Sequence, residues 1–286
     1  MQKIPVRRLT DSPNRPSSPG MFKIREVASL LKGTDLIQPL HRHDFYFILA
    51  LRKGKGLHEI DFSPYKITDN CVFILRPGQV HRLELRAGST GYLVEFNAEF
   101  LHPINRDSAD RLRKAGYKNF CKVAEQNFNK LDNCLKYMFH EFTGRSEGHL
   151  AIIKANIDIF LLELNREKAH PEPSTKIGSY TQERFEEFLD FLEQHIASRK
   201  EVAHYTQLMN LSSYQLNEIC KTAVGKTPSR LINERIILEA KRHLLATSNQ
   251  VKEIADQLGY EDVSYFIRFF RKHTGHSPEV FRTSLM

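Results

Sequence analysis

The apolar residues of this chain follow two different periods, and the change between them limits the folds that the chain can adopt. From about Met21 to Phe100, short segments alternate apolar and polar residues and are separated by Gly, Pro, Asn and Asp, as strands are. About seven or eight such strands predict a β-sandwich or a small β-barrel. From Lys122 to Lys168 the apolar residues recur at the period of a helix instead.

One predicted helical segment is broader in its apolar surface than a single packing face requires. Residues Leu150–Leu164 are apolar over more than one stripe of a helix. Such a helix needs cover on two sides, and two arrangements stay open. The barrel and a partner subunit cover one side each, or the helix is buried entirely within one chain. If the chain forms a dimer, we expect it to use the helices of residues 123–167.

The order of these segments predicts an α+β chain of two domains. We expect an N-terminal domain over residues 1–168, a polar linker with two prolines over 169–178, and an all-helical C-terminal domain over 179–286. The segment Met1–Gly20 contains four prolines and no apolar core of a secretory signal. It is therefore expected to be a loose arm.

Composition places the chain among packed globular proteins. It has 286 residues, of which 41% are hydrophobic and 27% charged. The longest strongly apolar run, Phe45–Leu51, is far shorter than the ~20 residues of a membrane span. The four cysteines are far apart and form no C-x-x-C pair, which predicts neither a disulfide framework nor a cysteine zinc site and fits a reducing cytoplasm. They are Cys71, Cys121, Cys134 and Cys220.

The net charge of +8 is weak evidence for nucleic-acid binding because of where it lies. Residues 181–286 have 14 Lys and Arg against 14 Asp and Glu, so the whole excess belongs to residues 1–180. A basic surface in the C-terminal domain must therefore come from the segregation of charges onto different faces.

The C-terminal domain contains an internal repeat with an offset of 50 residues. Each copy reads as a short helix, a turn, a longer helix, a glycine stop and a Ser/Thr-Pro restart. The longer helices begin at the N-caps Ser212 and Asp262. Two copies predict a duplicated helix-turn-helix rather than a solenoid. The matched residues are Gln207-Leu208 with Gln257-Leu258, Gly225 with Gly275, and Pro228 with Pro278.

The second copy carries a family signature. The stretch KEIADQLGYEDVSYFIRFFRKHTGHSPEVFR, residues 252–282, resembles the signature of the AraC/XylS family of bacterial transcription regulators. The resemblance implies two helix-turn-helix units that a long helix joins and that bind adjacent major-groove segments on one face of DNA. Pro228–Leu245 would be that connecting helix. Its length of about 27 Å is close to the ~34 Å that separates successive major grooves.

The first copy departs from this pattern at two positions in the alignment at offset 50. Tyr205 stands opposite Ala255, where the family has a small residue, and Met209 stands opposite the turn glycine Gly259. We therefore expect the first unit to be splayed or to read DNA more loosely than the second.

The helical period divides the two longer helices into a buried and an exposed face. In the second helix Phe266 and Phe270 should lie in the core, so that Arg268 is free to contact a base edge, with Arg271 and Lys272 on phosphate. In the first helix Leu216 and Ile219 should be buried. The candidate DNA-binding residues are Ser213, Tyr214, Gln215, Asn217, Lys221, Ser264, Tyr265, Arg268, Arg271 and Lys272.

Two segments of the N-terminal domain resemble the cupin segments of sugar-sensing members of the same family. They are His41–Tyr46 and Arg76–His81. The resemblance implies a cupin-like β-barrel, and we expect its histidines His41, His43 and His81 to bind a small-molecule effector.

Two other roles of the three histidines stay open: a three-histidine site for Zn or Fe, and structural packing at the mouth of the barrel. Cupin enzymes usually add a carboxylate a few residues beyond the H-x-H, whereas this chain has Phe47, Ile48 and Leu49 there. We therefore expect no catalytic residues, no cofactor and no stoichiometric metal.

Together these features predict a cytoplasmic, DNA-binding transcription regulator. The expected partners are double-stranded DNA, a second copy of the chain, RNA polymerase and a small-molecule effector such as a sugar, with no membrane. One alternative is a cupin metalloenzyme that carries a DNA-binding tail, and another is a co-regulator that acts only through protein contacts with RNA polymerase.

Overall fold

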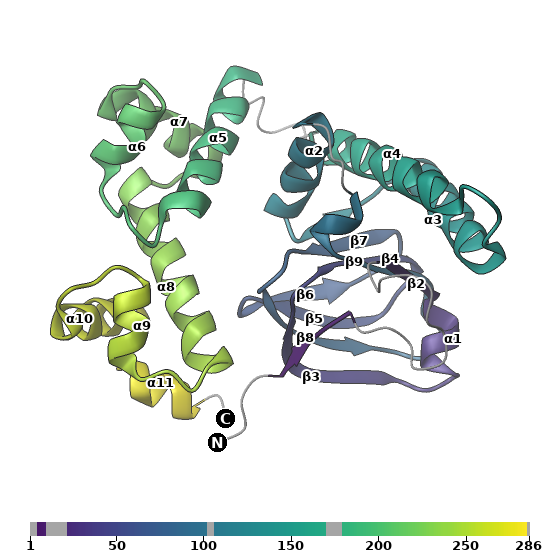
Figure 1. The fold of residues 1–286 in the computed structure, drawn as a ribbon, viewed down its shortest axis with the longest axis horizontal. Coiled ribbons are helices and arrows are strands. Elements are labelled where there is room, and N and C mark those ends of the chain that lie inside the picture. Colours follow the sequence, from purple (N-terminus) through teal and green to yellow (C-terminus); the bar gives the residue numbers. More distant parts are fainter. Residues whose placement is uncertain (1–4, 10–21, 102–105, 170–178, 285–286) are drawn as a thin grey trace. The chain divides into compact units, whose positions relative to one another are not determined.

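The computed structural model describes residues 5–9, 22–101, 106–169 and 179–284, and these residues form two compact units (Figure 1). The first unit lies within residues 5–169 and the second within 179–284. The expected linker lies outside the described residues except for its first position. Most of the expected arm lies outside them too, but Val6–Arg7 is not loose: it forms a short strand parallel to Arg42–His43.

The N-terminal unit consists of two five-stranded sheets and the helices that cover one of them. The sheet orders are β1-β3-β8-β5-β6 and β10-β7-β4-β9-β2. The strands are β1 (Val6–Arg7), β2 (Phe22–Glu26), β3 (Leu36–His43), β4 (Tyr46–Lys53), β5 (Gly56–Ile60), β6 (Ser63–Ile67), β7 (Cys71–Leu75), β8 (Val80–Leu85), β9 (Thr90–Phe96) and β10 (Phe120–Lys122). The helices are α1 (Val27–Leu31), the 3-10 turn η1 (Ala98–Leu101), α2 (Arg106–Tyr117), α3 (Glu125–Gly144) and α4 (His149–Ala169).

Strand β4 explains the longest apolar run of the sequence. It lies between β7 and β9 and is buried on both faces. Phe47 and Leu49 point into the core between the two sheets, while Ile48 and Ala50 join the core beneath the helices. A strand that is covered on both sides needs apolar residues at every position, so the alternation of polar residues disappears there.

Helices α3 and α4 pack on each other and over the outer face of the sheet that contains β4 (Figure 1). Two arrangements were left open for the broad apolar helix, which is α4. At most of its apolar positions the structure shows burial within the chain. Ile153 and Ile157 are buried within the chain, at 0% and 1% exposed. Leu150, Ile159 and Leu162 remain exposed, at 40%, 49% and 39%.

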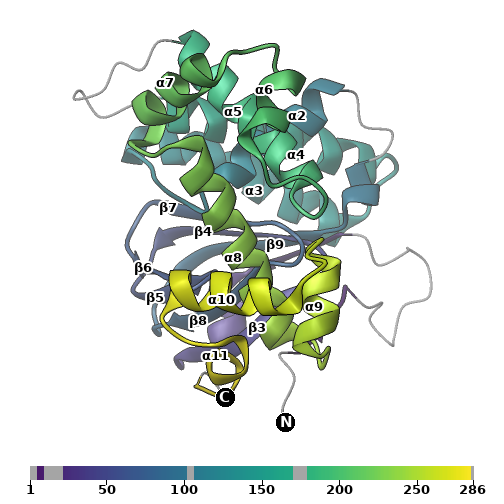
Figure 2. The ribbon, with the colours of Figure 1, turned by 90° about the vertical axis from the view of Figure 1, so that its left-hand side faces the viewer.

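The C-terminal unit is all-helical, and its helices pack around the long helix α8. Helices α6 and α7 contact α8, and so do α9, α10 and α11, which Figure 2 draws in green and yellow. The helices are α5 (Ser179–His195), α6 (Val202–Leu208), α7 (Ser213–Val224), α8 (Pro228–Ala246), α9 (Val251–Gln257), α10 (Val263–Thr274) and α11 (Pro278–Ser284).

The predicted helix boundaries are confirmed by the capping geometry. The Ser212 hydroxyl accepts from the backbone N–H of Gln215, whose side chain accepts from the Ser212 backbone in return. The Asp262 carboxylate accepts from the Ser264 backbone N–H. Gly225 ends α7 in the left-handed conformation, as its counterpart ends α10.

The repeat itself departs from the alignment at offset 50 in the first helix of each unit. The backbone N–H of Leu211 donates to Thr206, and the N–H of Tyr260 donates to Ala255 in the same way. These equivalent positions are 49 residues apart, because the turn between α6 and α7 is one residue shorter than the turn between α9 and α10.

The two expected departures in the first unit were therefore wrong. The counterpart of Ala255 is Thr206, which is small, and not Tyr205. The counterpart of Gly259 is Asn210, which takes the same left-handed conformation with φ 51° against 68°. Asparagine tolerates that conformation better than most residues. The first unit thus has the same kind of turn as the second unit. The turn therefore gives no reason to expect a splayed first unit.

Gly259 is constrained by a close approach that Gly225 does not have. A Cβ on Gly259 would lie 2.1 Å from the carbonyl oxygen of Ala197, whereas a Cβ on Gly225 would meet nothing within 4 Å. We expect Gly259→Ala to lower the free energy of unfolding by about 3 kcal/mol. Gly225→Ala should cost only the left-handed strain, about 1 kcal/mol.

Urea unfolding of the full chain, followed by circular dichroism, measures both losses. Equal losses for the two variants would contradict the close approach at Ala197.

Candidate functional site

Helix α10 has one face in the core and one in solvent. Phe266 and Phe270 are completely buried, as the helical period predicts. The Arg268 side chain is 70% exposed, and its nearest carboxylate is that of Asp262, with 3.9 Å between Nη2 and Oδ2. The remaining predicted residues of this helix are exposed as well: Ser264, Tyr265, Arg271 and Lys272.

Helix α7 has the same arrangement in the first unit. Leu216 is completely buried and Ile219 nearly so, while Tyr214 is 74% exposed. The Gln215 side chain is held at the helix start, because its Oε1 accepts from the Ser212 backbone N–H. Of the other predicted residues, Ser213 and Lys221 are exposed and Asn217 is half-buried.

The zero net charge of this part of the chain hides a segregation of charges between helices. Helix α10 has three basic residues, Arg268, Arg271 and Lys272, and no acidic one. Helix α5 has five acidic residues and one arginine. The exposed face of α10 is therefore positive although the domain as a whole is neutral, and such a face attracts phosphate.

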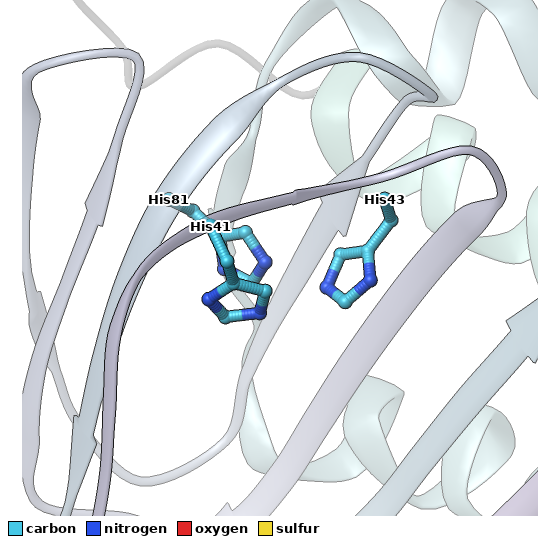
Figure 3. Close-up of side chains that lie close together, drawn as sticks. All are labelled: His41, His43 and His81. Atoms are coloured by element: carbon cyan, nitrogen blue, oxygen red, sulfur yellow. The ribbon is translucent and has the colours of Figure 1, made fainter. Parts of the chain in front are cut away.

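The structure brings the three predicted histidines of the N-terminal unit together inside the barrel. His41 and His43 lie on β3, and His81 lies on β8 directly opposite His41. One potential ligand nitrogen from each ring lies within 4.8 Å of the others, and all three side chains are buried. Figure 3 shows the three rings gathered on one side of the two strands.

Sequence reasoning missed a fourth histidine of the same cluster. His58 on β5 is completely buried, and its Nε2 lies 2.9 Å from Nδ1 of His81. Its signal was present: His58 and Ile60 are two residues apart on one predicted strand and therefore share a face. The pairing of β5 with β8 that brings His58 to His81 could not be predicted from the sequence.

Burial keeps these rings uncharged at neutral pH. Desolvation lowers the pKa of His41 to about 4 and the pKa values of His43 and His58 to about 3. Desolvation also lowers the pKa of His81 well below its ordinary value. Neutral imidazole is the form that offers a lone pair to a hydrogen-bond donor or to a metal ion.

A cavity of about 440 Å³ lies next to this cluster, and His43 is the histidine that lines it. Four basic residues and one acidic residue contribute to its wall. The acidic residue, Glu95, accepts from Arg25 at 2.7 Å. The basic ones are Arg7, Arg8, Lys23 and Arg25.

Among the described residues, no helix combines the length and the apolar character that crossing a membrane requires.

Two known domain families match the chain, one in each unit. The family described as a helix-turn-helix domain matches residues 205–284, and the AraC-like ligand binding domain matches residues 33–151. The HTH-type transcriptional activator RhaS of Yersinia pestis bv. Antiqua (strain Angola) is 24% identical over 257 residues. The match covers 86% of this chain and 90% of that protein.

Solved structures of similar proteins match either most of this chain or its C-terminal part alone. The fatty-acid-bound ToxT of Vibrio cholerae strain SCE256 is 16% identical, with a TM-score of 0.41, over 94% of this chain and 97% of that one. The C-terminal domain of the response regulator yesN from Fusobacterium nucleatum is 29% identical, with a TM-score of 0.34. That match covers 35% of this chain and 98% of that domain.

The two matched domains define the class of the protein: a DNA-binding transcription regulator with a ligand-binding domain. Its similarity to the transcriptional activator RhaS extends over most of the chain. The chain belongs to the AraC/XylS family of transcription regulators. It is therefore not an enzyme, and the alternative of a metalloenzyme with a DNA-binding tail is set aside.

Proposed function

We propose that this regulator binds a specific DNA site with α7 and α10, in response to a small molecule bound in its N-terminal domain. One observation carries the DNA-binding part of this proposal. Two capped helices, joined by α8, each bury one face in the same unit and leave the other in solvent, and the exposed face of α10 is positive. That is the form in which a helix enters a major groove.

The proposed roles of the exposed residues follow from their chemistry. Arg268 is long enough to donate two hydrogen bonds to guanine, and it lies in the middle of α10. Arg271 and Lys272 in the last turn are suited to phosphate contacts. In α7 the proposed DNA-binding residues are Ser213, Tyr214, Gln215, Asn217 and Lys221.

Arg268→Ala should weaken binding to the specific site by about 1–3 kcal/mol and relax the base preference at one position. Lys272→Ala should instead weaken binding to all sequences alike and reduce the salt slope by about 1. Titrations at matched salt, with a selected site and with random DNA, measure both effects. Lys66→Ala, exposed on β6, is the control. Unchanged specific binding by Arg268→Ala would exclude α10 as the reading helix.

The cavity supports an effector that carries a negative charge. Its basic residues outnumber Glu95 by four to one, and burial lowers the pKa of the Arg7 guanidinium. An anionic ligand would therefore gain more there than a neutral sugar does. His43 contributes to the wall. The rings of His41 and His81 pack against the ring of His43, and the centroid of each lies 4.8 Å from the His43 centroid.

Sugar acids such as glucuronate and galacturonate should raise the thermal unfolding midpoint of the protein, and the matching neutral sugars should not. Arg7→Gln should reduce this shift, because it removes a cavity charge that lies on β1. Lys66→Gln lies outside the cavity lining and should leave the shift unchanged. Thermal shift titrations measure the effect. An equal response to acids and neutral sugars would contradict an anionic effector.

The exposed apolar residues of α4 support a homodimer. Ala151, Ala155, Ile159 and Leu162 are exposed and follow one another at helical spacing along one face. A second copy of α4 would cover this stripe. We further propose that the regulator acts in the cytoplasm and contacts RNA polymerase. We propose that it is an activator, as the name of the Yersinia relative says of that protein.

Ile159→Glu should shift the protein from dimer to monomer in sedimentation velocity while its circular dichroism stays unchanged. Ile157→Glu is the matched control: it lies two residues away, is buried within the chain, and should unfold the N-terminal unit instead. A wild-type monomer, or a dimer that survives Ile159→Glu, would contradict the proposed interface.

A further inference from the structure

We propose that His41, His43 and His81 form a binding site for a divalent transition-metal ion, with Zn²⁺ as the best match, and that His58 is a positioning residue for His81. The three rings come from two paired strands of one rigid sheet. This site is independent of DNA reading by α7 and α10. The proposal replaces two expectations from the sequence, namely that the three histidines contact the effector and that the chain holds no stoichiometric metal.

The first argument is that the cluster leaves most of its polar atoms unsatisfied. Among the described residues, five of the eight ring nitrogens of His41, His43, His58 and His81 are buried without a hydrogen-bond partner. A buried polar atom without a partner lowers stability, and native proteins keep few of them. Three of these five atoms, one from each of His41, His43 and His81, can be lone pairs, and a single cation that accepts all three would satisfy them together.

The second argument is the tautomer that the surroundings impose. The Pro39 carbonyl can only accept a hydrogen bond, so the Nδ1 of His41, 2.7 Å away, must carry the proton. Its Nε2 is then a bare lone pair, buried and without a partner. Metal-binding histidines in proteins usually have this arrangement, with one nitrogen donating to a carbonyl and the other on the metal.

His58 has the corresponding relation to His81. When Nδ1 of His81 donates to Nε2 of His58 across 2.9 Å, the Nε2 of His81 is left as a second lone pair. His43 has no hydrogen-bond partner at either nitrogen, so each of its tautomers offers a lone pair. The three ligands are thus supplied without breaking any hydrogen bond of the cluster.

The spacing of the ligand atoms suits a transition metal. One nitrogen of each of the three rings lies within 4.8 Å of one nitrogen of the other two, and Zn–N bonds of about 2.0–2.1 Å in a tetrahedral site place ligand nitrogens about 3.4 Å apart. Small rotations of the imidazole rings bring the nitrogens to that separation. Neutral imidazoles without a carboxylate favour Zn²⁺ and its neighbours over Mg²⁺ or Ca²⁺.

Three protein ligands leave one coordination position open, and three neutral rings leave the charge of the ion uncompensated. His43 also lines the cavity with Arg7 and Arg25. An anionic group in that cavity would complete the coordination and balance the charge. This last step rests on the proposed effector, whereas metal binding itself does not.

The test uses untagged full-length protein that has been dialysed against a chelator. Co²⁺ serves as the spectroscopic probe because tetrahedral Co²⁺ absorbs strongly in the visible range, and Zn²⁺ is then added as competitor. We expect saturation at one ion per chain and displacement by Zn²⁺, with elemental analysis giving the same ratio. His41→Phe and His81→Phe should abolish the visible spectrum, whereas His58→Phe should keep it with about 10–100-fold weaker binding.

His140→Gln is the control for binding at the surface, because that side chain is 81% exposed. Circular dichroism and a thermal unfolding midpoint unchanged from the wild type show that the N-terminal unit of each variant is folded. Unchanged DNA binding shows separately that the DNA-binding proposal stands or fails on its own. Weak Co²⁺ binding without a tetrahedral spectrum would overturn the site. So would binding that survives the double change His41→Phe and His81→Phe, since the three histidines would then have a packing role.

Discussion

The apolar face of α8 is the interaction on which the DNA-binding half of the molecule depends. Ile232, Ile236, Ala240 and Leu244 follow one another at four-residue spacing and are all buried. The two helix-turn-helix units pack on this helix, whose 19 residues give it a length of about 28 Å. Arg282 stabilises the C-terminal end of α8, because its guanidinium donates to the carbonyl of Leu244. A loss of this face would remove the surface on which both units pack.

The helix boundaries of this half could be predicted because local chemistry sets them. Caps and glycine stops act over three or four residues, and those at Ser212, Asp262 and Gly225 lie where the sequence places them. The turn of the first unit was misaligned because identical Gln-Leu pairs fixed the offset. Hydrogen bonds of Thr206 and Ala255, which no residue identity reveals, define the true correspondence.

The N-terminal half was predictable in class and less so in detail. Its strands follow the alternation of apolar residues, but β1 and β10 are too short to show a period, and α1 and α2 lie where no helical stripe was recognised. The histidine cluster was predictable in one part and not in another. His41 and His43 share a strand face by spacing alone, whereas the approach of His58 and His81 depends on which strands pair. Strand pairing is a property of the whole sheet and not of any segment.

Protection of guanine N7 in a selected DNA site tests most directly whether both units read DNA. The geometry of α8 predicts protection in two successive major grooves, about 10–10.5 base pairs apart on one face of the duplex, by a single chain. In this experiment Asn217→Ala should remove protection in one groove only. Protection confined to one groove by the wild-type protein, or spread over opposite faces of the duplex, would contradict the account.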